Sequence, residues 1–92
     1  MSAPTIPIAQ PYPHGSLPGH ALYRLHFDAE ETARKLLDEI LRLAPDGRDY
    51  EDNQSLERAR AEHRVRVEKA DSLVRDLHAI TEGLARQKET RW

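Results

Sequence analysis

Histidines are the residues of this sequence that most directly suggest chemistry. Three of the five, His14, His20 and His26, recur every six residues in the N-terminal part. Imidazole nitrogens commonly bind zinc, copper and nickel, so the repeat raises the question of a metal site. A period of six matches neither a helix face nor a strand face, and no carboxylate cluster accompanies it. We therefore expect no metal and no cofactor, and interpret these histidines as solvated or packing residues.

A second chemical hypothesis comes from the stretch 58–69, RARAEHRVRVEK. Arginine-rich helices bind phosphate backbones, and Arg60 and Arg64 would share one side of such a helix. Glutamates interleave with these basic residues, the stretch has no aromatic residue, and the whole chain carries a net charge of −2. We expect a solvated, salt-bridged face, and nucleic-acid binding through Arg60 and Arg64 stays as an alternative hypothesis.

His63 raises a different question, because it falls on the apolar side of the same expected helix. A polar residue at a heptad position can set the register or the choice of partner. We interpret His63 as such a seam residue rather than as a ligand or a base. Its protonation at about pH 6 would loosen the seam.

Acidic residues surround Tyr50 in a turn-rich stretch that contains Asp46, Asp49, Glu51 and Asp52. Their spacing differs from that of a calcium-binding loop, so we interpret the stretch as the loop of a helical hairpin. A small inhibitor or accessory subunit can also dock on a larger complex through an acidic loop. That function stays as a second alternative.

Catalytic motifs are missing from the sequence. The chain has no cysteine, no Gly-rich phosphate loop, and no G-x-S-x-G or H-E-x-x-H pattern. We therefore expect a noncatalytic protein.

The length and composition favour solvated helices. A chain of 92 residues buries a limited core, and 33% of its residues are charged while 5% are aromatic. No stretch approaches the ~20 apolar residues that span a bilayer, and the first residues lack the pattern of a secretion signal. We expect a soluble, cytoplasmic protein that shares its stability between chains.

Prolines and glycines divide the chain into elements. Those before residue 20 predict a flexible tail over 1–19. The alternation of Ala21, Tyr23, Leu25 and Phe27 predicts an extended arm or short strand over 20–27. Residues 28–92 are expected to form a helical hairpin with a short helix at about 28–44, which Asp28 would cap, and a long helix at about 54–90.

The long helix is expected to carry a coiled-coil seam. Its heptad positions are Leu56, His63, Ala70, Leu77 and Leu84. A helix that begins at residue 28 covers only the first half of this seam, which leaves the stretch 73–84 bare. We therefore expect this stretch to contact the arm or a second chain, through Leu73, Leu77, Ile80 and Leu84, with Tyr23 and Phe27 as arm anchors.

These observations together predict an all-α fold, an antiparallel helical hairpin with an extended N-terminal arm that completes a bundle by oligomerisation. In a generic way the chain resembles small helical-hairpin proteins of bacteria, plasmids and phages. We expect a noncatalytic protein–protein interaction or assembly module. Its expected partner is a second copy, with a dimer as the first expectation, or else a larger protein, and neither nucleic acid nor membrane.

Overall fold

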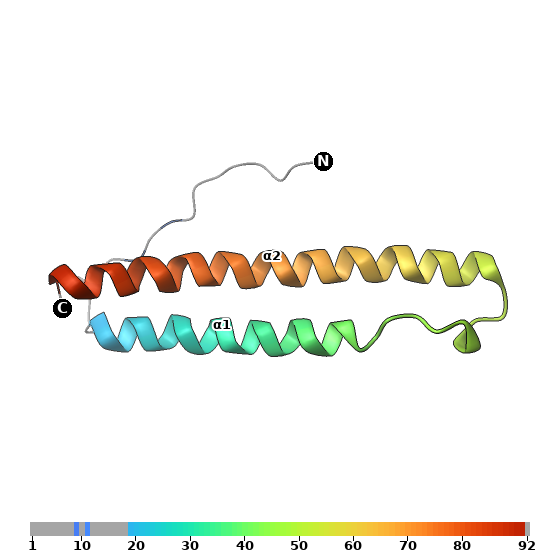
Figure 1. Ribbon diagram of the computed structural model, residues 1–92, viewed down its shortest axis with the longest axis horizontal. Helices are drawn as coiled ribbons and strands as arrows, with labels where there is room; N and C mark the ends of the chain where they lie inside the picture. The colour runs from blue at the N-terminus through green and yellow to red at the C-terminus, as the bar shows by residue number, and fades with distance from the viewer. Residues whose placement is uncertain (1–8, 10, 12–18, 92) are drawn as a thin grey trace. The chain divides into compact units, whose positions relative to one another are not determined.

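The computed structural model describes residues 9, 11 and 19–91, and the side chains of these as far as residue 87. It contains two α-helices, α1 (Gly19–Leu41) and α2 (Asn53–Arg91), which pack against each other, and a short 3₁₀ helix, η1 (Gly47–Asp49), between them in the sequence (Figure 1). No strand occurs among the described residues. The prediction of an all-helical fold is therefore confirmed, and the helices divide between two compact units: unit 1 (1–30 and 76–92) and unit 2 (31–75).

The prediction of an extended arm over 20–27 is wrong, because these residues belong to α1. The apolar residues that alternate also satisfy the helical spacing of four. The rings of Tyr23 and Phe27 stack with centroids 6.0 Å apart, and the Arg24 Nε atom lies 3.4 Å from the Asp28 Oδ1 atom. Asp28 lies well within the bounds of α1, so it is an interior residue of the helix and not its cap. An alternation of eight residues is too short to distinguish a strand from two turns of helix.

The end of α1 also differs from the expectation, since the helix stops at Leu41 and not at residue 44. The next turn is tighter, with the Leu43 backbone N–H donating to the Ile40 carbonyl at 2.9 Å. Pro45 accounts for the early end, because it has no N–H to donate to the Leu41 carbonyl and its ring would clash with that carbonyl in a continued helix. The tail expected over 1–19 lies outside the described residues except for residues 9, 11 and Gly19, and so does His14.

The long helix is confirmed, with bounds at Asn53 and Arg91 against an expected 54–90. Asp52 stands directly before its first residue, and its Oδ1 atom accepts a hydrogen bond from the Ser55 backbone N–H at 2.7 Å. A side-chain acceptor at this place satisfies one of the free donors of the first turn. The chain therefore uses the last acid of the loop, Asp52, as the cap of α2.

Within unit 2, the end of α1 and the start of α2 run in opposite directions on either side of the loop (Figure 1). Its buried apolar residues are Ala33, Ala70 and Val74. Two of the three are alanines, so the helices of this unit meet over small side chains. Little apolar area is removed from water at such a contact, and larger side chains stay at the edges of the seam.

Within unit 1, residues 19–30 of α1 accompany residues 76–91 of α2. Leu84 is fully buried there, and the buried polar residues are Glu30 and Thr81. The Thr81 hydroxyl donates to the Leu77 carbonyl at 2.9 Å, which satisfies its donor inside the helix. Across the part of the chain that the structure describes, neither helix has an apolar stretch of the length and hydropathy that crossing a membrane requires.

Candidate functional site

An open apolar groove lies between the two helix segments of unit 2, and we call it the Leu36–Leu73 groove. Its volume is about 270 Å³. The lining residues are Leu36, Ile40, Arg66, Lys69, Ala70 and Leu73. Leu36 is 49% exposed and Leu73 is 46% exposed, although both are large apolar side chains. The groove therefore presents apolar surface to solvent in the part of the hairpin where the helices meet over alanines.

Helical spacing explains how the sequence builds this groove. Leu36 and Ile40 are four residues apart on α1, so they follow one another along one face. On α2, Arg66, Lys69 and Leu73 are separated by three and then four residues, which again defines one face. Ala70 is buried between these residues, and its methyl group is too small to fill the space between the helices.

The edges of the groove are charged. On the α2 edge, the Arg66 Nη2 atom lies 3.3 Å from the Glu62 Oε2 atom. The Lys69 side chain makes no hydrogen bond and no ion pair with any residue that the structure describes. On α1, Glu39 follows Leu36 by three residues and forms an exposed ion pair with Arg42 at 3.0 Å. An apolar centre with a charged rim is the common composition of a protein–protein contact surface.

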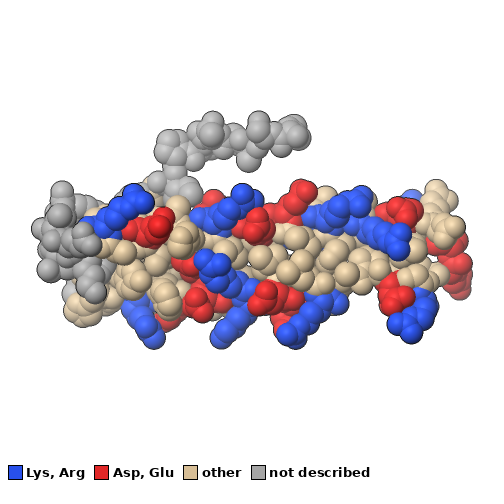
Figure 2. Space-filling model, in the orientation of Figure 1, with Lys and Arg blue, Asp and Glu red and all other residues tan. Residues whose placement is uncertain are grey.

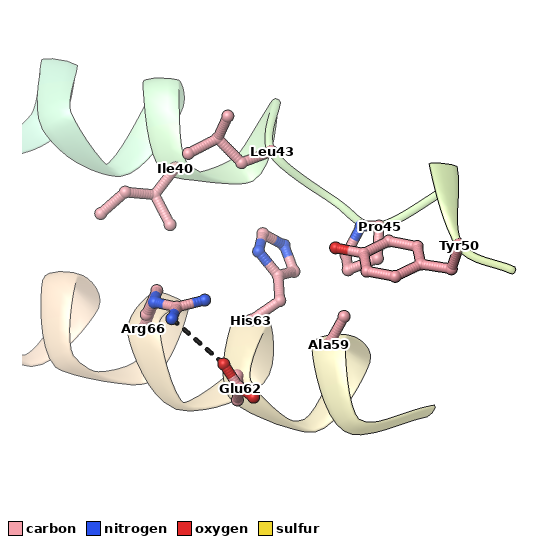
Figure 3. Close-up of a pocket in the computed structure, with 8 residues that line it drawn as sticks. All are labelled: Ile40, Leu43, Pro45, Tyr50, Ala59, Glu62, His63 and Arg66. Atoms are coloured by element: carbon pink, nitrogen blue, oxygen red, sulfur yellow. Dashed lines mark hydrogen bonds and ion pairs between the residues drawn. The ribbon is translucent and has the colours of Figure 1, made fainter. Parts of the chain in front are cut away.

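A second hollow of unit 2, of about 340 Å³, lies near the end of the hairpin (Figure 3). Apolar lining comes from both helices and the loop, and the polar lining comes from α2. The lining residues are Ile40, Leu43, Pro45, Tyr50, Ala59, Glu62, His63 and Arg66. Figure 3 shows the His63 ring pointing from α2 towards Ile40 and Leu43, and the Arg66 guanidinium turned towards Glu62.

His63 thus lies at the seam of unit 2, in the position that the heptad pattern predicts for it. The residue is half-buried, and no hydrogen bond or ion pair joins its ring to another described residue. No partner that the structure describes holds the imidazole in one orientation, as a base in nucleophilic catalysis is commonly held. Its influence on register and on pH sensitivity stays a prediction.

Most residues of the predicted contact stretch are more buried within the single chain than expected. Leu84 is 0% exposed within the single chain, and Leu77 and Ile80 are half-buried, whereas Leu73 is exposed. The reason is the early start of α1, whose residues 19–30 accompany residues 76–91 of α2 in unit 1. The assumption that an uncovered seam extends over 73–84 is therefore wrong.

The anchors expected on the arm are part of this helix as well. Tyr23 and Phe27 are half-buried residues of α1 and stack on each other. The Arg24 guanidinium lies over the Phe27 ring, 5.7 Å from its centroid. This arrangement covers an aromatic face with a cation from the same helix.

Leu36 is the groove residue that sequence reasoning missed. Leu36 and Leu37 are consecutive on α1 and point about 100° apart, so they lie at different places across a broad apolar stripe. Leu37 is half-buried and Leu36 is exposed. The pair of adjacent leucines is the signal that an apolar surface wider than one seam exists on α1.

Two basic residues of the arginine-rich stretch, Arg60 and Arg66, form local ion pairs. Arg60 lies 2.9 Å from Glu57, and Arg64 is exposed. Figure 2 shows side chains of both signs interspersed along the helices on the face drawn, without a broad basic region. Nucleic-acid binding through Arg60 and Arg64 therefore stays an untested hypothesis.

The acidic loop uses two of its four acids for its own structure. Asp46 accepts hydrogen bonds from the side chain of Arg48 at 2.9 Å and from its backbone N–H at 3.0 Å. These bonds, first that to the guanidinium, hold the pKa of Asp46 below its ordinary value. Asp52 caps α2, while Asp49 and Glu51 are exposed.

Metal-binding geometry is missing from the described part of the chain, where no three His, Cys, Asp or Glu side chains come together in a way that holds an ion. Of the N-terminal histidines, His26 forms a hydrogen bond through its Nδ1 atom with the Leu22 carbonyl at 2.9 Å. Comparison with protein-family models, with curated proteins and with solved structures finds no significant match to this chain.

Proposed function

We propose that this chain is a noncatalytic protein–protein interaction module that associates with a second copy of itself through the Leu36–Leu73 groove. The observation that carries the proposal is the exposure of Leu36 and Leu73 on opposite sides of one apolar hollow. Apolar surface that lies together and is rimmed by charge marks contact sites on small proteins.

The small core supports the same proposal. Among the described residues, the buried apolar side chains are Ala33, Ala70, Val74 and Leu84. Helices in water gain most of their stability from tertiary packing of an apolar face rather than from intrinsic propensity. A second hairpin on the groove would add such packing and would make a four-helix bundle.

The proposed contact differs from the one expected from the sequence. Leu73 belongs to both contact surfaces, whereas Leu84 belongs only to the expected one. Leu84 already packs inside the chain, so a second chain reaches it only if the helices separate. The contact surface moves instead to unit 2, where Leu36 takes the place that the arm anchors had in the prediction. A larger partner protein is the alternative occupant of the same groove.

The test is the mass of the chain by light scattering over a concentration series. We expect a dimer that the Leu73→Glu substitution converts to a helical monomer, since it places a charge in the apolar contact. Val65→Glu is the matched control, because Val65 is 48% exposed on the same helix and does not line the groove. If Leu73→Glu loses helix content, Leu36→Gln provides the deciding mass.

A wild-type chain that is monomeric at every concentration would overturn self-association and would point to a larger partner. A dimer that survives both Leu73→Glu and Leu36→Gln would show that chains meet through another surface.

A further inference from the structure

We infer that the second copy lies with its α1 over α2 of the first chain, joined by two ion pairs between Lys69 of one copy and Glu39 of the other. This inference rests on the proposed self-association and adds the arrangement of the chains. The arrangement is inferred from the charged residues beside the Leu36–Leu73 groove and from their positions along the helix axes.

Lys69 is the first part of the argument. It lines the groove on the α2 edge, and its ammonium group has neither a hydrogen bond nor an ion pair among the described residues. Its neighbour on that edge, Arg66, pairs with Glu62. A lysine beside an apolar surface can cover part of it with its methylene stem and direct its ammonium group to a carboxylate at the rim of a contact.

Glu39 supplies a carboxylate on the opposite edge. It follows Leu36 by three residues and directly precedes Ile40, so it lies beside two lining residues of the groove without lining it itself. Its ion pair with Arg42, at 3.0 Å, joins side chains that are both more than half exposed. Exposed pairs of this kind contribute little to stability, so Glu39 can exchange Arg42 for a lysine of a second chain at small cost.

The two groups lie at the same level along the hairpin. Ile40, the residue after Glu39, lines the groove together with Lys69 and Ala70. A half-turn about an axis parallel to the helices places α2 of one copy over α1 of the other and preserves this level. Lys69 of each copy then faces Glu39 of the other, and the symmetry repeats the pair.

The other face-to-face arrangement is disfavoured by charge. A two-fold axis perpendicular to the helices at this level would place α2 over α2 and would bring the two Lys69 ammonium groups, which have no partner among the described residues, towards each other. Like charges at a contact oppose association, whereas opposite charges select the partner and its orientation. The parallel axis therefore matches the groove better.

Charge reversal tests the arrangement. We expect Lys69→Glu and Glu39→Lys each to weaken the dimer about tenfold, because each creates two like-charge contacts. An equimolar mixture of the two variants is expected to form a heterodimer of nearly wild-type affinity, since every facing pair is then opposite in charge. The weakening should shrink at high salt.

Two controls separate this effect from a general change of charge. Arg64→Glu makes the same change as Lys69→Glu at an exposed residue outside the groove and should leave the affinity unchanged. Arg42→Gln removes the intrachain ion pair of Glu39 but keeps the negative charge of Glu39, so it should have little effect on the affinity of the dimer.

The outcomes distinguish the two proposals. A dimer that neither charge reversal weakens, or variants that do not recover on mixing, would overturn the arrangement while self-association stands. A wild-type monomer would overturn the proposed function itself.

Discussion

The Nδ1 atom of His78 lies 3.2 Å from the Oε2 atom of Glu30, and it links α2 to α1 inside unit 1. Glu30 is 5% exposed, so this carboxylate has left most of its water. An ionised carboxylate only accepts hydrogen bonds, so the distance fits an Nδ1–H donor. The Nε2 atom of the same ring lies 3.9 Å from Glu82. A buried polar group of this kind must keep its hydrogen-bond partners when the chain folds.

His78→Leu is therefore expected to destabilise the chain by about 1–3 kcal/mol, since it removes a donor from a buried carboxylate. The double variant Glu30→Leu with His78→Leu should recover part of this loss, because it also removes the buried carboxylate that His78→Leu deprives of a donor, while position 78 itself is about half exposed. Urea unfolding followed by circular dichroism measures both free energies. A double variant that is less stable than His78→Leu alone would show that Glu30 contributes through other contacts.

Leu84 provides a second prediction. We expect Leu84→Ala to cost about 2–5 kcal/mol, because it opens a cavity at a fully buried site. The effect should not depend on protein concentration, since Leu84 is buried within one chain. Leu25→Ala is the matched control, because Leu25 belongs to the same unit and is 57% exposed. Equal losses at Leu84 and Leu25 would argue against the interior position of Leu84.

The helical start of α1 is tested by proline. Arg24→Pro is expected to destabilise the chain by about 3 kcal/mol or more and to lower the helix signal, because a proline in a helix interior removes a hydrogen bond and clashes with the preceding turn. His20→Pro should be tolerated, since it falls in the first turn of α1. An extended arm would accept proline at both positions equally well.

The lowered pKa of Asp46 predicts how the loop responds to acid. The folded loop stabilises the ionised carboxylate of Asp46 relative to the protonated one. The contribution of Asp46 to the stability of the chain is therefore complete above the ordinary pKa of an aspartate. The contribution is lost as the pH falls through the lowered pKa of the folded loop. Carboxyl titration by NMR should show Asp46 below its ordinary value in the wild type and closer to that value in Arg48→Ala. An unchanged Asp46 titration in Arg48→Ala would exclude the guanidinium as the main cause.

The sequence by itself determined the helical class of this protein, its loop and its long helix. Leu56, Ala70, Leu77 and Leu84 repeat every seven residues with His63, and all of them face the interior at least in part. The repeat is readable because helical periodicity over nearly forty residues leaves no competing element. The turn-rich residues around Asp46 mark the loop for an equally local reason.

The start of α1 and the surfaces that follow from it were decided by tertiary structure. Tyr23, Arg24 and Phe27 fit both a short strand and a helix, and the contact of their segment with residues 76–91 selects the helix. Leu84 and Glu30 are buried in unit 1, whereas Leu73 in unit 2 is exposed. Local spacing lists which residues share a face, but only packing against the other helix determines which face loses its water.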